Sequence, residues 1–179
     1  MVMGLRVLWM WLTRRRRGRL AVTAIGKLPQ IVWPNDLDLN LHMNNGRYFS
    51  VADIGRMDWW ARTLVWKNAM KRGWRPMAGD SNARFSKALL VFERYALHSR
   101  LIGWNAKWMF HEHRFMQGDK VTAVVVVRYL WHGEGKKQTP ADVLALVGHT
   151  EPSPPLPEWV VEWSDAQDAL TAELKAARA

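Results

Sequence analysis

The sequence predicts an α+β domain in which an antiparallel β-sheet wraps around one long central helix, with a C-terminal helical extension. Three observations predict this fold: a short apolar segment at residues 27–34, a helical pattern over residues 45–72, and a period of two after Pro76. The helical segment is apolar on most sides, which is typical of an enclosed helix. Because an antiparallel sheet must cover its apolar face, the simplest arrangement wraps the sheet around that helix.

The N-terminal arm, residues 1–26, consists of an apolar segment, GLRVLWMWL, followed directly by TRRRRGR. The apolar run of about eight residues is far below the roughly 20 that a spanning helix needs. Most of the positive charge follows this apolar run, whereas a secretory signal carries its positive charge before the apolar region. Two interpretations stay open. Residues 1–20 form a helix on an anionic membrane surface, or the arm packs on the domain or stays loose.

The composition excludes several classes of function. The net charge is +10, but residues 1–27 hold seven basic residues and no acidic one, which leaves 19 basic against 16 acidic residues elsewhere. The basicity therefore belongs to the arm, and we expect no nucleic-acid partner. The chain has no cysteine, which excludes disulfides, thiolate metal sites and a cysteine nucleophile.

The segment after the central helix reads as four strands. The helix stops at RGWRP, residues 72–76, and hairpin-like turns follow at residues 103–105 and 117–119. Residues 121–130 are apolar on both faces, which predicts a strand in the middle of the sheet. The segment HGEGKKQ, which follows Trp131, is predicted to be a loop.

The C-terminal part begins with a short helix capped by Thr139, with Pro140 at its first position. EPSPPLPEW is a proline-rich connector, and a final helix is predicted to start at Ser164 or Asp165. The chain thus divides into an arm (1–26), a main domain (27–150), and a connector with a C-terminal helix (151–179).

The stretch DLDLNLHMNNGRYF, residues 36–49, places many polar side chains where the central helix begins. A helix N-terminus leaves N–H groups unpaired and suits a carbonyl oxygen that becomes negative during a reaction. Asp38 or Asp36 could activate water or attack directly. Asn40 and His42 could orient water or polarise a carbonyl. The alternative is a solvated turn with an N-cap, where Asp and Asn are common.

This stretch resembles the D-x-D-x-N-x-H-x-N-N-x-x-Y signature of the hotdog thioesterases, which include the acyl-carrier-protein thioesterases of plants and the 4-hydroxybenzoyl-CoA thioesterase-like superfamily. The segments at residues 100–105, 114–118 and 151–170 resemble thioesterase superfamily member 6 and its bacterial relatives, and the similarity covers residues 27–170. The resemblance implies a hotdog fold over residues 27–150. It also implies hydrolysis of acyl-CoA or acyl-carrier-protein thioesters, as in fatty acid metabolism, without a cofactor.

The resemblance further implies a homodimer or a dimer of dimers with active sites at the subunit interface. Carried over position by position, it makes Asp38 the catalytic carboxylate, assisted by Asn40 and His42. It implies that the backbone N–H groups at the helix start face the thioester oxygen. The substrate-binding residues that it implies are Asn44, Asn45, Gly46 and Tyr48. The expected location is the cytoplasm, either free or peripheral on the inner face of a membrane.

One feature departs from the plant enzymes, which carry an additional glutamate on the strand after the helix. The corresponding stretch here, GDSNARFS, has none, and Asp80, Ser81 or Asn82 would have to substitute. This departure keeps an alternative function open. The alternative is a catalytically weak or inactive hotdog protein that binds acyl-CoA or acts as a membrane-associated scaffold.

Two other groups of residues are candidates for sites. His111 and His113 share one face of a strand, and His98 is the only nearby strand histidine, so we expect a polar or edge face and no metal site. Three tryptophans on the central helix could line an acyl tunnel, although their helical spacing favours packing in the core or between subunits. They are Trp59, Trp60 and Trp66.

Overall fold

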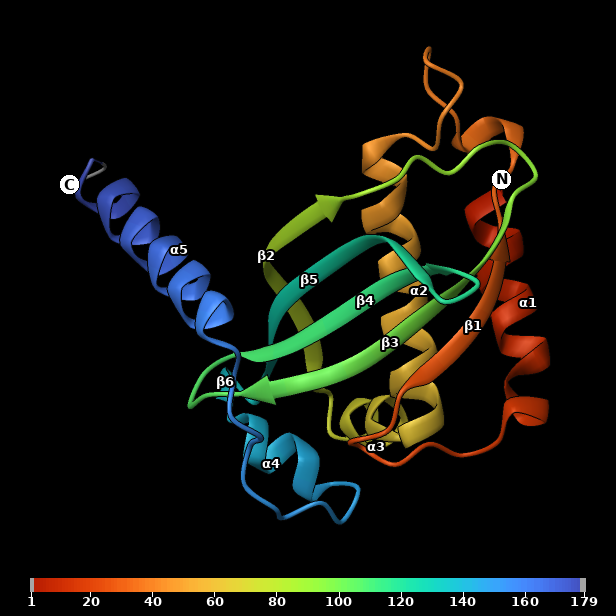
Figure 1. Cartoon of the computed structure of the whole chain (residues 1–179). Helices are drawn as coiled ribbons and strands as arrows, with labels where there is room; N and C mark the ends of the chain where they lie inside the picture. Colours follow the sequence, from red (N-terminus) through yellow and green to blue (C-terminus); the bar gives the residue numbers. More distant parts are fainter. Residues whose placement is uncertain (1, 178–179) are drawn as a thin grey trace.

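The computed structural model describes residues 2–177 and shows an antiparallel sheet curled around one long helix, as predicted (Figure 1). The strand order is β1-β3-β4-β5-β2, and β6 pairs with β5. The strands are β1 (Gly26–Ile31), β2 (Arg75–Phe85), β3 (Arg94–Trp104), β4 (Met109–Gln117), β5 (Lys120–Gly133) and β6 (Lys136–Gln138). The apolar segment 121–130 lies in β5, between β4 and β2, so its internal position is confirmed. β6 replaces part of the predicted loop after Trp131, because residues 136–138 fold back onto β5 as a hairpin.

The central helix is α2 (Asn45–Thr63), and its inner side fills the sheet's concave face. The predicted helix over residues 45–72 is divided, because Leu64 adopts a left-handed conformation with φ 66° and ends α2. A separate short helix, α3 (Val65–Lys71), follows. Leucine rarely adopts this conformation, so residue type gave no signal for the break. Trp59 and Trp60 are buried in the core, where Trp60 stacks on Trp66.

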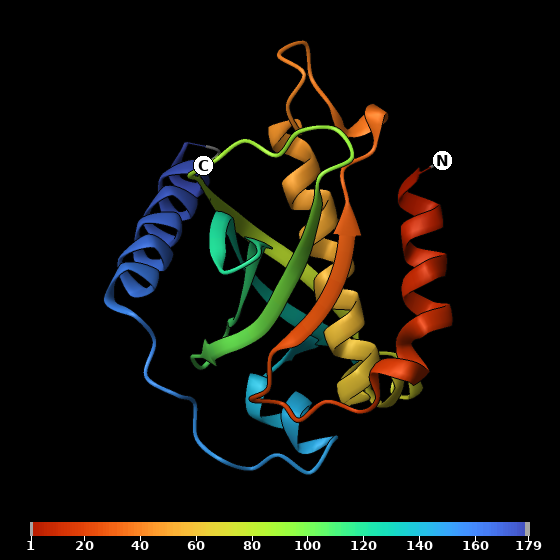
Figure 2. The same ribbon diagram turned by 45° about the vertical axis from the view of Figure 1, so that its right-hand side comes forward.

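The N-terminal arm forms α1 (Val2–Arg17), which packs on α2 and runs beside β1 (Figures 1 and 2). Met10 is fully buried in this contact. Arg17 pairs with the buried carboxylate of Asp58 at 2.5 Å. Arg62 of α2 donates to the backbone oxygens of Arg17 and Gly18, at the end of α1. Of the two interpretations of the arm, packing on the domain is therefore part of the structure.

Two helices complete the chain. Thr139 caps α4 (Pro140–Ala145) by accepting a hydrogen bond from the Asp142 N–H, as the sequence predicts. α5 (Glu158–Ala176) starts after Pro157, so the predicted start at Ser164 or Asp165 is wrong by about two turns. α5 lies against the face of the sheet opposite to α2 (Figure 2). The first turns of α5 are positioned by tertiary contact, since Val160 is fully buried there.

Candidate active site

Residues 36–44 form a narrow hairpin between a short 3-10 helix, η1 (Pro34–Asp36), and α2. Leu37 pairs with Met43, and the Asp38 N–H donates to the His42 carbonyl oxygen at 2.9 Å. Leu41 closes the tip with a left-handed φ of 60°. The side chain of Leu39 is 100% exposed at this tip, and the hairpin projects from one end of the molecule (Figure 1). The polar stretch is therefore a built hairpin and not an irregular loop.

The first aspartate of the motif, Asp36, is buried and committed to holding the hairpin base. Its carboxylate accepts from Arg6 of α1 at 2.5 Å and from the Trp33 N–H at 2.8 Å. Arg47 lies 3.9 Å from its second oxygen. Sequence reasoning missed the role of Arg6, for which the only signal was a single arginine inside an apolar run. Asp36 is thus a structural residue of the site.

Asp38, the second aspartate, is half-buried, and its side chain makes no ion pair in the described part of the chain. Its Oδ1 accepts from the Asn40 N–H at 2.9 Å and from the His42 N–H at 3.4 Å. Its Oδ2 accepts no hydrogen bond from residues 2–177, so it is open to a water or a substrate. The hairpin brings Asp38, Asn40 and His42 together on one turn, with Asn40 and His42 exposed to solvent.

The start of α2 presents one unpaired backbone donor. Asn44 is the N-cap, and its side chain accepts from the Gly46 N–H at 2.9 Å. The Asn45 N–H makes no hydrogen bond within the described residues, which fits a role as a donor to a substrate oxygen. The Tyr48 side chain is buried, and its ring packs on Phe85 of β2 and Phe115 of β4. Tyr48 therefore anchors the start of α2 to the sheet. Burial raises the pKa of the Tyr48 hydroxyl.

The strand that follows the central helix offers no carboxylate on the α2 side. Asp80 pairs with Arg128 at 2.6 Å, and Arg128 reaches the backbone oxygen of Ser164 in α5. Asp80 therefore lies on the face of the sheet that α5 covers. By strand alternation Asn82 shares that face and Ser81 faces α2. Among these three residues, only Ser81 is on the side of the helix.

His111 and His113 are completely buried, so their assignment to a polar or edge face is wrong. They point from the interior strand β4 toward α2, where His111 Nδ1 lies 3.0 Å from the Tyr129 hydroxyl and His113 Nδ1 lies 2.8 Å from Ser99 Oγ. Burial lowers the pKa of both imidazoles well below the usual range, and the nearby positive charge of Arg56 lowers it further. The hydroxyl partners let both rings stay neutral inside the core.

His98 alternates to the opposite face of β3 and cannot join these two histidines. No group of three or more potential metal-ligating side chains occurs within the described residues.

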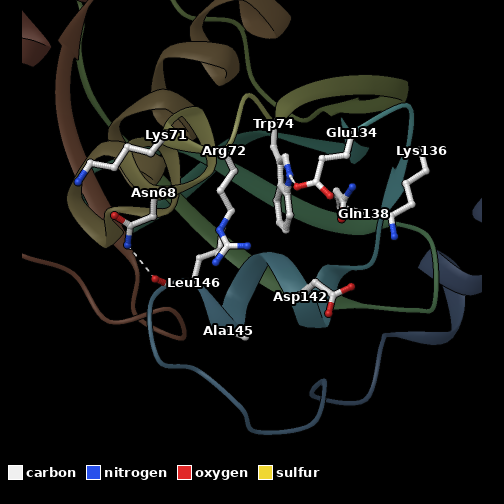
Figure 3. A pocket seen from close by; sticks show the side chains of 10 residues that line it. All are labelled: Asn68, Lys71, Arg72, Trp74, Glu134, Lys136, Gln138, Asp142, Ala145 and Leu146. Atoms are coloured by element: carbon white, nitrogen blue, oxygen red, sulfur yellow. Dashed lines mark hydrogen bonds between the residues drawn. The ribbon is translucent and has the colours of Figure 1, made fainter.

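A polar hollow of about 700 Å³ lies between α3, α4 and the β5–β6 hairpin, at the end of the molecule opposite to the 36–44 hairpin (Figures 1 and 3). Trp74 Nε1 donates to Glu134 at 3.0 Å, and Asn68 Nδ2 donates to the Leu146 oxygen at 2.7 Å. The hollow is lined by side chains of both signs, three basic and two acidic. The charged residues are Lys71, Arg72, Lys136, Glu134 and Asp142.

Comparison with known proteins agrees with the fold. A family model described as the thioesterase-like superfamily matches residues 32–164. The chain is 30% identical to Protein THEM6 of Xenopus laevis over 148 residues. This aligned region covers 82% of this chain and 70% of that protein. It is 26% identical over 119 residues to a probable thioesterase of Saccharomyces cerevisiae, over 64% of this chain and 51% of that protein.

Solved structures share the fold at low sequence identity. A probable thioesterase from Escherichia coli superimposes with a TM-score of 0.62 at 14% identity, covering 69% of this chain and 98% of that chain. A hypothetical protein from Staphylococcus aureus, solved in complex with CoA, gives a TM-score of 0.61 at 12% identity, covering 80% and 96% of the two chains. At these identities the likeness shows the fold alone.

Proposed function

Because the chain belongs to the thioesterase-like superfamily, we propose that it hydrolyses acyl thioesters at the hairpin of residues 36–44, with Asp38 as the catalytic carboxylate. The observation that carries this proposal is the division of labour between the two motif aspartates. Asp36 is buried in an ion pair, whereas Asp38 is half-buried with Oδ2 open. Only the second carboxylate is free to act on a substrate.

In the proposed reaction the thioester carbonyl oxygen accepts a hydrogen bond from the Asn45 N–H. Asp38 takes a proton from a water molecule, and the resulting hydroxide adds to the carbonyl carbon. The carbon–sulfur bond then breaks, and the thiolate leaves as a thiol with the proton that Asp38 took from the water. The backbone N–H groups of Asn40 and His42 donate to Asp38, and we propose that their exposed side chains orient the water. The helix end supplies about 1–2 kcal/mol, so most of the chemistry depends on the carboxylate.

The donor is proposed to be a CoA or carrier-protein thioester, and the S. aureus neighbour solved with CoA makes acyl-CoA the first substrate to test. The experiment measures thiol release from a panel of acyl-CoAs by wild type and by Asp38→Asn. We expect at least a hundredfold loss in kcat, on the order of what a positioned general base contributes. Asp80→Asn is the matched control, because its carboxylate lies on the other face of the sheet. Undiminished turnover by Asp38→Asn would remove Asp38 from the mechanism.

A second candidate function is supported by the position of Asp80. The strand carboxylate that the plant enzymes use has no counterpart on the α2 side here, since Asp80 is paired with Arg128. A protein without that group could bind acyl-CoA without turning it over. In that case calorimetry would detect acyl-CoA binding by the wild-type chain, and no thiol release would be seen from any acyl-CoA.

We also propose that the enzyme is a homodimer, or a dimer of such dimers, assembled through the free edge of β2. β2 is an 11-residue edge strand, and within the described part of the chain no strand pairs with its outer edge. Two apolar side chains of β2 are exposed, Met77 at 55% and Phe85 at 41%. Long uncovered edges with exposed apolar residues favour strand pairing with another chain. Sedimentation equilibrium tests this, and a monomer at working concentration would contradict it.

The proposed location is the cytoplasm, either free or peripheral on the inner face of a membrane. None of the helices within residues 2–177 is both long and apolar enough to cross a bilayer.

A further inference from the structure

The outer face of α1 is apolar although the helix is already packed on the domain. Leu5, Leu8, Trp9 and Leu12 are between 42% and 70% exposed. A groove of about 880 Å³ runs between these side chains and the β1 edge, and Trp33, itself 42% exposed, lines it as well. An isolated exposed leucine needs no explanation, but a continuous apolar groove indicates a binding surface.

The charged side chains that line the groove are basic, although Arg6 is already paired with Asp36. The charged residues that line the groove are Arg6 and Arg94, and no acidic residue lines it. The C-terminal end of α1 adds Arg15 and Arg16, both exposed, and Arg19 follows one residue after Gly18. Apolar and aromatic side chains beside clustered arginines are typical of helices that lie in the interface of an anionic bilayer.

From this juxtaposition we propose that α1 and the groove beside β1 dock the protein on the surface of an anionic membrane, with lipid chains entering the groove. A second copy of the chain fits less well, because a symmetric contact would bring two arginine clusters together. The direction of docking is fixed by structure. Arg6 and Arg17 hold α1 to the domain through buried carboxylates, so the outer face stays turned outward.

Docking would also place the active-site hairpin at a defined height above the membrane. Arg6 is at once a lining residue of the groove and the partner of Asp36 at the hairpin base. The surface that contacts lipid and the loop that carries Asp38 therefore share one rigid connection. This inference depends on the N-terminal surface and not on the thioester reaction.

The test is flotation of the full chain with phosphatidylcholine vesicles, with and without phosphatidylglycerol. We expect binding to the anionic vesicles only, and release by high salt, because the attraction to the headgroups is screened. Arg15→Gln with Arg16→Gln should weaken binding about fivefold for each arginine. Leu8→Ser with Leu12→Ser should weaken it on the order of tenfold for each leucine.

Exposed leucines on another helix provide the matched control. Leu170 and Leu174 of α5 are 46% and 52% exposed, and the Leu170→Ser, Leu174→Ser variant should bind like wild type. Equal loss in this control, or no effect of salt on the wild-type chain, would overturn the proposal. The proposal would also be overturned if the wild-type chain bound no vesicles but self-associated, and if the α1 variants abolished that self-association. The surface would then join two copies of the chain. Thiol release from soluble acyl-CoA should be unchanged in every variant, which separates this test from the proposed reaction.

Discussion

The buried histidines of β4 make the stability of the fold depend on pH in a defined window. His111 and His113 are both fully buried between the sheet and α2. Burial lowers the pKa of each imidazole well below its usual range, and the charge of Arg56 acts in the same direction. The folded protein therefore holds both rings neutral at pH values where an exposed histidine takes up a proton. We expect the protein to lose stability as the pH falls below about 6.5.

The magnitude follows from the proton balance. Below about pH 6.5 the unfolded chain binds two protons that the folded chain does not bind, so the free energy of unfolding decreases with decreasing pH. Between about pH 7.5 and about pH 5.5 the two histidines together remove about 2.7 kcal/mol. Partial burial also lowers the pKa of His98, which adds a smaller contribution of the same sign. A loss of this size is a large part of the stability of an ordinary domain.

Urea denaturation at a series of pH values measures this effect directly in the wild-type chain. The midpoint should decrease between neutral and mildly acidic pH while the m-value stays constant. His111→Gln and His113→Gln should each remove about half of the pH dependence, because glutamine does not titrate. A wild-type stability that is flat over this window would refute the reasoning. So would a double variant that keeps the full dependence.

Other predictions concern buried contacts and use the same denaturation assay. Arg6→Met should cost about 3–5 kcal/mol because it leaves the Asp36 carboxylate buried. The Arg6→Met, Asp36→Asn double variant should cost less than the sum of the two single variants, and strict additivity would contradict the pairing. Arg128→Met should destabilise less than Arg6→Met, because its partners Asp80 and Asp168 are partly exposed, and it should open α5 to limited proteolysis. An uncut helix would show that α5 is held by other contacts. Gly55→Ala should cost about 1–3 kcal/mol, because its Cβ would lie 2.3 Å from Ser99 Oγ. An unchanged free energy of unfolding would mean that β3 can move away from α2 to make room for the added methyl group.

The order of elements could be predicted because the period of the apolar pattern changes where the structure changes. Residues 121–130 are apolar on both faces, and β5 is indeed buried on both. Thr139 and Pro140 form a helix start that depends only on local chemistry, and the structure has it in place. The polar stretch at residues 36–49 was predicted to lie where the central helix begins, and it does.

The elements that sequence reasoning missed are those that depend on tertiary contacts. α5 begins at Glu158 inside a stretch that reads as a connector, because burial of Val160 and Trp163 against the sheet extends the helix. The burial of His111 and His113 could not be predicted from their spacing. It depends on Tyr129 and Ser99, which lie on other strands and supply the hydroxyl partners. A strand pattern shows which residues share a face but not what that face meets.

The two motif aspartates show why the candidate site needed the structure. By residue chemistry alone Asp36 and Asp38 are equivalent candidates, two positions apart on the same segment, and only the family resemblance distinguishes Asp38. The first reaches the interior, where its carboxylate is paired with Arg6 from a distant part of the chain and with the Trp33 N–H. The second meets only the N–H groups of its own hairpin, which orient one oxygen and leave the other open. Because α1 supplies the charge that holds Asp36, removal of α1 should disturb the catalytic hairpin, although among the described side chains the hydrogen-bond partners of Asp38 all come from the hairpin itself.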